Sequence, residues 1–126
     1  MTEEVDIYKA ENHQEASSCL SNLIANDISS NKSEPYSIGL SGGNTPKLAY
    51  SMMLNDIKDF SNITLWTIDE RWLPITDENS NQKMINSSFK STNANILEIP
   101  FSDEDPFKDA EPYSKLLDDN INKFNT

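Results

Sequence analysis

A short glycine-containing segment is the first place in this sequence whose residues could do chemistry. All three glycines of the chain lie between positions 39 and 43, just before Asn44, Thr45 and Pro46. Glycine takes φ > 0 freely, and it lets a ligand approach the main chain closely. Thr45 is a suitable N-cap and Pro46 a favoured first helical residue, so residues 42–48 are expected to present free backbone N–H groups at a positive helix end. A phosphate group would fit there.

The side chains around these glycines suit the same ligand. Ser41, Asn44 and Thr45 offer hydrogen bonds, and Lys47 adds a positive charge. The spacing matches neither the Walker A loop, G-x-x-x-x-G-K-[ST], nor the dinucleotide motif G-x-G-x-x-G. The alternative is a tight strand-to-helix turn that binds nothing, and the loop alone does not decide between the two.

A second group of charged residues follows the apolar segment Ile63–Ile68. Asp69, Glu70 and Arg71 come next, and Arg71 is the only arginine of the chain. We expect these side chains at the carboxyl edge of the sheet, where open α/β folds bind ligands, beside the glycine segment. The alternative is a structural ion pair between Arg71 and one of the two carboxylates. Two such loops at one edge favour a pocket more than either loop alone.

A third polar motif, residues 77–81 with Met84 following, precedes a predicted helix. Ser80 and Asn79 are both suitable N-caps, and capping is the simpler interpretation of this motif. Little chemistry can be inferred from it in isolation.

An α/β framework is needed to position these motifs. Short apolar runs alternate with longer segments of helical period, which is typical of a parallel sheet covered by helices. We expect strands over Val5–Tyr8, Tyr36–Leu40, Ile63–Ile68 and Ile96–Ile99, and helices over about 12–30, after Pro46, over 80–89 and over 111–124. The predicted buried face of the first helix carries Ala16, Leu20, Leu23, Ile24 and Ile28, and that of the last carries Tyr113, Leu116, Leu117 and Ile121. The fold class is therefore α/β: an open, mostly parallel, Rossmann-like sheet with helices on both faces.

Composition and charge exclude several classes of function. The 126 residues are one domain's worth, and 10 Lys+Arg against 21 Asp+Glu give a net charge of −11, which argues against nucleic-acid binding. One cysteine, Cys19, and one histidine, His13, form neither an intrachain disulfide nor a zinc site of the Cys/His type, so no metal is expected. The acidic amino terminus lacks signal-peptide features, and no segment approaches 18 consecutive apolar residues. These features predict a cytoplasmic protein with no membrane partner.

Taken together, the three motifs resemble a known family. Leu40 to Lys47, Asp69 to Pro74 and Ser80-Asn81-x-x-Met84 follow one another as in the amino-terminal half of the 6-phosphogluconolactonases, within the larger glucosamine-6-phosphate isomerase and deaminase family. The family's usual loop reads S-G-G-S-T-P, so Asn44 is a mild departure that keeps a short polar side chain. Asp-Glu-Arg-Trp is similar to the lactonase branch, whereas the deaminase branch typically reads Asp-Glu-Tyr. The resemblance spans nearly the whole chain.

The resemblance implies hydrolysis of 6-phosphoglucono-δ-lactone to 6-phosphogluconate, without a cofactor. Residues 41–45 and Lys47 would hold the sugar phosphate or its hydroxyls, with Ser80 and Asn81 in the same binding site. Asp69 and Arg71 would line the pocket as the catalytic pair, and Glu70 would orient Arg71. A sugar-phosphate isomerase or deaminase of the same family stays open as an alternative, with Asp69 as its base.

The resemblance also implies that part of the family's domain is missing. Family members continue with a strand and a G-x-G-x-D-G-H segment whose histidine is taken as the general base, and this sequence ends at Thr126 before it. His13 matches no family motif. The expectation is therefore a single, truncated lactonase-like domain over 1–126, with either impaired activity or a purely sugar-phosphate-binding role. An unpaired sheet edge would favour self-association.

Overall fold

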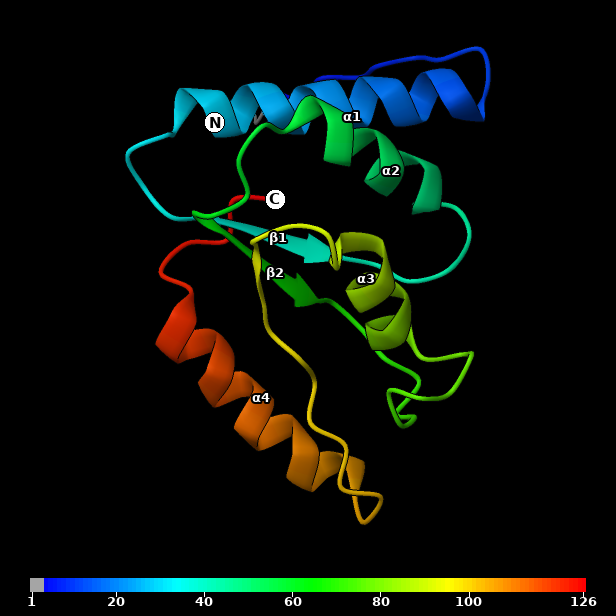
Figure 1. The fold of residues 1–126 in the computed structure, drawn as a ribbon, viewed down its shortest axis with the longest axis vertical. Coiled ribbons are helices and arrows are strands. Elements are labelled where there is room, and N and C mark those ends of the chain that lie inside the picture. The colour runs from blue at the N-terminus through cyan, green and yellow to red at the C-terminus, as the bar shows by residue number, and fades with distance from the viewer. Residues whose placement is uncertain (1–3) are drawn as a thin grey trace.

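The computed structural model describes residues 4–126, and its strands and helices alternate along the chain (Figure 1). The first helix, α1, spans His13–Ser30, and the later helices are α2 (Lys47–Asp56), α3 (Asn81–Phe89) and α4 (Pro106–Asn120). The strands are β1 (Tyr36–Leu40), β2 (Ile63–Thr67) and β3 (Asn95–Ile96). This is the predicted α/β class.

The strands form one parallel sheet in the order β1-β2-β3. Tyr36 pairs with Ile63 and Leu40 with Thr67, so β1 and β2 are in register along their full length. The other edge of β1 pairs with the end of the chain: Gly39 N–H donates to Thr126 C=O (2.8 Å), and Thr126 N–H donates to Ser37 C=O (3.2 Å). The free edge that the sequence predicts is therefore partly paired at β1.

Helices cover the sheet in layers. Figure 1 shows α1 and α2 on one side of the sheet and α4 on the other, which is the three-layer arrangement that the sequence predicts. Ile38, Leu40 and Leu65 from the strands are buried against apolar side chains of α2 and α3. Phe89 of α3 lies at the centre of this core, with its ring centroid 5.4 Å from that of Tyr50 and 6.0 Å from that of Phe60.

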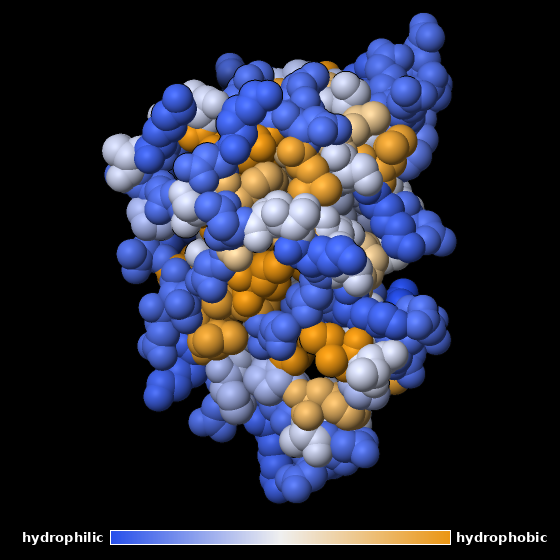
Figure 2. Space-filling model, in the orientation of Figure 1, coloured by the Kyte–Doolittle hydropathy of each residue, from blue (hydrophilic) through white to orange (hydrophobic). Residues whose placement is uncertain are grey.

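On the opposite face of the sheet, the side chain of Trp66 packs against Gly39 and Phe124. The Trp66 ring lies against Gly39, where a Cβ atom would come within 2.6 Å of it, and its centroid is 5.1 Å from that of Phe124. Gly39 is therefore a packing requirement of this face. Figure 2 shows apolar side chains reaching the surface in the middle of the molecule, while polar side chains cover its two ends.

Two predicted strands differ from the structure. Val5–Tyr8 forms no strand, and Val5 and Ile7 are 78% and 79% exposed; β1 pairs instead with β2 on one edge and, in part, with Thr126 on the other. Ile96–Ile99 shortens to Asn95–Ile96 as a strand, although Leu97 N–H still donates to Leu65 C=O (2.9 Å).

The buried face of α1 also differs from the predicted one. Leu20 and Leu23 are 45% and 38% exposed, whereas Ser17 and Ser21 are buried beside Ile24. Ser21 donates a hydrogen bond to the Asp56 carboxylate (2.7 Å) at the end of α2. Small serines let the two helices approach, so the contact face is rotated away from the leucines.

The last helix begins earlier than predicted. Asp105 caps α4 by accepting a hydrogen bond from Phe107 N–H (2.9 Å), with Pro106 as the first helical residue. Asp followed by Pro is a helix start signal that the sequence contains. The start predicted at residue 111 relied instead on the apolar side chains from Tyr113 onwards. Within residues 4–126, no helix combines the length and apolar composition needed to cross a membrane.

Candidate functional site

The glycine segment lies at the carboxyl end of β1, where the order of the strands along the chain changes direction. From β1 the path leads through α2 to β2 on one side, and α4 later returns the chain to Thr126 on the other side of β1. The carboxyl end of β1, where residues 41–46 begin, is therefore a topological switch point. Ligands of open α/β sheets bind in the crevice at such points.

Gly42 joins this loop to the start of α3. A Cβ atom at Gly42 would lie 2.0 Å from Asn81 Oδ1, so only glycine fits against this buried side chain. Asn81 Nδ2 in turn donates to the backbone carbonyl of Asp69 (3.0 Å). The Asn81 side chain therefore brings together the glycine loop and the Asp69 loop, two motifs expected at the same edge.

Gly43 gives the loop its curvature. Its φ is +89°, a conformation that residues with side chains rarely adopt, and no atom lies within 4 Å of the position that a Cβ would take. Among the described residues, the backbone N–H groups of Gly42, Gly43, Asn44 and Thr45 have no hydrogen-bond acceptor. These N–H groups are available for an anion.

The helix start after this loop differs from the predicted one by a residue. Pro46, not Thr45, is the N-cap of α2, and no side chain accepts a hydrogen bond from the first turn. Proline cannot supply a side-chain acceptor, so the helix end keeps its unpaired N–H groups and positive dipole. A Thr45 cap would accept a hydrogen bond from one of these N–H groups, so the observed helix start leaves one more donor free.

Side chains around the loop point to solvent or to a groove. Ser41, Asn44, Thr45 and Lys47 are exposed. The Ser41 carbonyl accepts a hydrogen bond from the Tyr50 hydroxyl (2.7 Å), and burial raises the pKa of Tyr50 to about 12. A groove of about 310 Å³ opens between α2 and α3; it is lined by Lys47, Glu78, Lys83, Met84, Ser87 and Ser88.

Glu70 is a structural residue of the second loop. Its carboxylate accepts four hydrogen bonds, from the backbone N–H groups of Arg71 (2.9 Å), Asn81 (2.7 Å) and Gln82 (2.9 Å) and from the Ser80 hydroxyl (2.8 Å). Burial raises the pKa of Glu70, but these hydrogen bonds outweigh it and hold the pKa below its ordinary value. A carboxylate at a helix N-terminus also suits the helix dipole.

Arg71 and Asp69 differ from Glu70 in being exposed. Arg71 Nη1 donates to the Asn79 carbonyl (2.9 Å), and no carboxylate lies within ion-pair distance of its guanidinium among the described residues. The structural ion pair weighed for this arginine is therefore not formed. Asp69 is held through its own backbone carbonyl by Asn81, and within residues 4–126 its carboxylate makes no hydrogen bond.

The third motif caps α3, as its simpler interpretation has it. Ser80 is the N-cap, and its hydroxyl accepts a hydrogen bond from Lys83 N–H (3.1 Å). Ser80 and Asn81 are both buried, with Asn81 only 3% exposed. In this structure the two residues hold the loops together and present little surface to a ligand.

Two residues of α4, which composition and spacing did not single out for the site, hold the end of β2 and the loop that follows it. The Tyr113 hydroxyl donates to Thr67 C=O (2.7 Å) and accepts from Thr67 N–H (2.9 Å), so it replaces a neighbouring strand there. The Asp109 carboxylate accepts from Trp72 Nε1 (2.9 Å). Tyr113 was predicted on the buried face of its helix, whereas Asp109 lies before the start, at residue 111, that was predicted for that helix.

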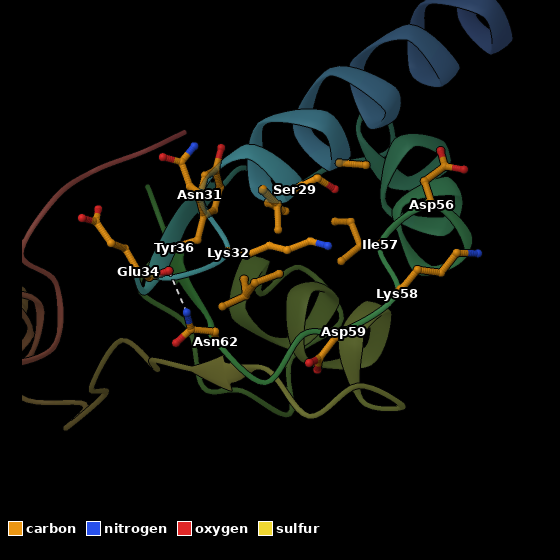
Figure 3. Close-up of a pocket in the computed structure, with 13 residues that line it drawn as sticks. Ser29, Asn31, Lys32, Glu34, Tyr36, Asp56, Ile57, Lys58, Asp59 and Asn62 are labelled. Carbon is orange, nitrogen blue, oxygen red and sulfur yellow. Dashed lines mark hydrogen bonds between the residues drawn. The ribbon is translucent and has the colours of Figure 1, made fainter.

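His13 and a second cavity are not part of this group of residues. His13 is the exposed first residue of α1. A cavity of about 430 Å³ lies at the amino ends of β1 and β2, lined by side chains that include Lys32, Lys58 and Asp59 (Figure 3). Because it opens at the opposite end of the strands, it is separate from the candidate site.

Comparisons with known proteins identify the family of this chain. The sequence profile of the family described as glucosamine-6-phosphate isomerases/6-phosphogluconolactonase matches residues 9–126. A probable 6-phosphogluconolactonase of Dictyostelium discoideum is 31% identical over 126 residues, covering 96% of this chain and 52% of that protein. A 6-phosphogluconolactonase of Synechocystis sp. is 33% identical over 84 residues, which are 64% of this chain and 35% of that protein. This chain thus spans about half the length of these relatives, or less.

Solved structures show the same fold. The 6-phosphogluconolactonase of Thermotoga maritima superposes with a TM-score of 0.81 at 20% identity, covering 93% of this chain and 55% of that one. A monomeric glucosamine-6-phosphate deaminase gives a TM-score of 0.75 at 22% identity, covering 91% of this chain and 51% of that one. At these identities the likeness concerns the fold, which both branches share.

Proposed function

Because this chain belongs to the glucosamine-6-phosphate isomerase/6-phosphogluconolactonase family, we propose that it binds a sugar phosphate and serves the hydrolysis of 6-phosphoglucono-δ-lactone to 6-phosphogluconate. This reaction is a step of the oxidative pentose phosphate pathway. One observation carries the proposal: the unpaired N–H groups of residues 42–45 and the Asp69 to Arg71 loop meet at the switch point, joined by Asn81.

Phosphate recognition is the part of this function that the residues support best. The N–H groups of Gly42, Gly43, Asn44 and Thr45 lie at the start of α2, where the helix dipole favours a dianion. Lys47 adds a positive charge beside them. In a chain with a net charge of −11, such a local positive site is needed to hold an anionic substrate.

Lactone opening requires an activated water and stabilisation of a developing oxyanion. The water oxygen adds to the carbonyl carbon, the bond from that carbon to the ring oxygen breaks, and the ring oxygen takes up the proton that the water loses. Arg71 has guanidinium N–H groups beyond the one bonded to Asn79, and these would stabilise the oxyanion and the product carboxylate. The free carboxylate of Asp69 would accept a hydrogen bond from the water or a sugar hydroxyl.

A second candidate function is sugar-phosphate binding without catalysis. The only histidine, His13, is the exposed first residue of α1, and among the described residues it makes no hydrogen bond or ion pair with Asp69 or Arg71. The lactonase branch is favoured over the deaminase branch because Arg71 and Trp72 follow Asp69-Glu70. No cofactor is part of either proposal, and a reducing, cytoplasmic setting is inferred from the single Cys19.

Two measurements on the 126-residue chain test these proposals. Isothermal titration calorimetry with 6-phosphogluconate should detect binding that Lys47→Ala and Arg71→Ala each weaken about tenfold or more, whereas the exposed control Lys90→Ala leaves it unchanged. Hydrolysis of 6-phosphoglucono-δ-lactone above its spontaneous rate would support the catalytic proposal. Binding without acceleration would support the second candidate, and no binding would contradict both.

A further inference from the structure

The loop that carries Arg71 contains an unusual backbone conformation. Trp72 has a φ of +49°, in the left-handed region that a bulky side chain rarely adopts. Such a residue persists only where its surroundings hold it in place. The contacts that hold Trp72 therefore also fix the course of the backbone that carries Arg71 and Asp69.

Asp109 supplies the polar contact to this tryptophan. It lies on α4, is only 6% exposed, and its Oδ2 accepts hydrogen bonds from Trp72 Nε1 (2.9 Å) and from Ser102 N–H (2.8 Å). The ring of Trp72 also packs at 5.2 Å between centroids on Phe101. One carboxylate oxygen therefore ties the Arg71 loop to both α4 and the segment before that helix.

The hydrogen bonds that Glu70 and Arg71 make lie on another side of the loop, at the start of α3. Glu70 fixes its own carboxylate to the start of α3, and Arg71 Nη1 is bonded to Asn79. Both contacts are on the α3 side of the loop, whereas Asp109 holds it from the opposite side of the sheet. Removing Asp109 would free Trp72 to leave its strained conformation, while the α3 contacts stay in place.

We propose that Asp109 is a positioning residue that fixes the Arg71 side chain for the ligand, acting through Trp72. The part concerning the ligand rests on the proposed function. The part concerning the loop rests on the contacts of Asp109 alone, and the two parts are tested separately.

Arg71, as the only arginine, makes a direct test of loop order available. An arginine-specific protease can cut this chain only between Arg71 and Trp72. Under native conditions the cutting rate follows the population of the opened loop. Each variant's rate is divided by its rate in urea, which removes the effect of sequence change next to the cut. A lysine-specific protease acting at the exposed Lys90 reports opening elsewhere.

Asp109→Ala and Trp72→Phe should each raise the normalised rate at Arg71 about ten- to a hundredfold, the factor for one lost hydrogen bond to a charged acceptor. Both remove the bond between Trp72 and Asp109, and each also loses or weakens a contact of its own, to Ser102 or to Phe101, so the double variant should show much less than the product of the two increases. Asp109→Asn, which keeps an acceptor, should restore most of the protection. Asp119→Ala, an exposed site on the same helix, should change nothing. Equal increases at Lys90, additive effects, or no increase would overturn the proposal for the loop.

Titration with 6-phosphogluconate separates the second part. If the wild-type chain binds, Asp109→Ala should weaken binding by a factor similar to its effect on cutting, and unchanged binding would overturn the role of Asp109 toward the ligand. Absence of wild-type binding would contradict the proposed function and with it the role toward the ligand, while the cutting rates still decide the role of Asp109 in the loop.

Discussion

Substituting Gly42 by alanine should destabilise this protein through a steric clash with Asn81, and a second substitution at Asn81 should relieve most of that clash. The new Cβ would lie 2.0 Å from Asn81 Oδ1 and 2.2 Å from its Cγ, well inside any real contact distance. Asn81 is 3% exposed and is held by its bond to the Asp69 carbonyl, so it has no free space to enter. The alanine must displace Asn81 or shift the glycine loop.

The size of the effect follows from its parts. Overpacking at a buried site costs about 1–3 kcal/mol, and loss of the bond from Asn81 Nδ2 to Asp69 adds about 0.5–1.5 kcal/mol. Replacing glycine also restricts the unfolded chain, which offsets about 0.4–1 kcal/mol. The free energy of unfolding should therefore fall by about 0.5–4 kcal/mol.

A double-mutant cycle in urea, followed by circular dichroism, tests the cause as well as the size. Gly42→Ala should cost clearly less in an Asn81→Ala background, because Asn81 Oδ1 and Cγ are then gone and only its Cβ, at 2.8 Å, still obstructs the new methyl group. Gly43→Ala is the matched control: it has open space but a φ of +89°, so it should cost about 1–2 kcal/mol in either background. If Gly42→Ala costs less than about 0.5 kcal/mol, or costs the same with and without Asn81, the packing argument is wrong.

Three further predictions concern other contacts of the same structure. Hydrogen bonding lowers the pKa of Glu70, so the contribution of its carboxylate to stability is present above the unfolded pKa of about 4.3 and is lost as the pH falls through the lower folded value. The difference in urea midpoint between the wild type and Glu70→Gln should therefore be constant from pH 7 to 5 and shrink below about pH 4.3. The exposed control Glu111→Gln should show no such change. Tyr113→Phe should lower the free energy of unfolding by about 1–3 kcal/mol because the backbone groups of Thr67 lose their partner, whereas Tyr8→Phe, at an exposed site, should change it little; equal effects would refute the bridging role. Self-association through exposed apolar side chains such as those of Val5 and Ile7 should increase with salt, which screens the net charge of −11, and a sedimentation coefficient independent of salt and concentration would contradict it.

Local patterns in the sequence were enough for the elements around the site. Tyr36–Leu40 matches β1 in full, and Ile63–Ile68 differs from β2 by one residue, because buried parallel strands consist of apolar, β-branched residues. Ser80 was weighed as the cap of α3 and is its cap. Adjacent parallel strands then put the glycine loop and the Asp69 loop at one edge.

Contacts between distant residues could not be predicted in this way. Val5 to Tyr8 has the alternation of a strand, but a strand also needs a partner, and none lies beside it among residues 4–126. The bond from Trp72 to Asp109 spans 37 positions and follows from the path of α4, which no local pattern contains. Gly42 was read as a source of backbone freedom, whereas its position is set by the side chain of Asn81, 39 residues later.

The central claim is that the glycine loop receives a phosphate on its free N–H groups, and the glycine amides test it most directly. In a ¹⁵N-labelled chain titrated with 6-phosphogluconate, the amide signals of Gly42 and Gly43 should shift strongly. The signal of Gly39, whose N–H is bonded to Thr126, should stay in place, and gluconate without the phosphate should move none of the three. Shifts confined to residues of the distant cavity, such as Lys32 and Lys58, or no shifts at all, would contradict the account.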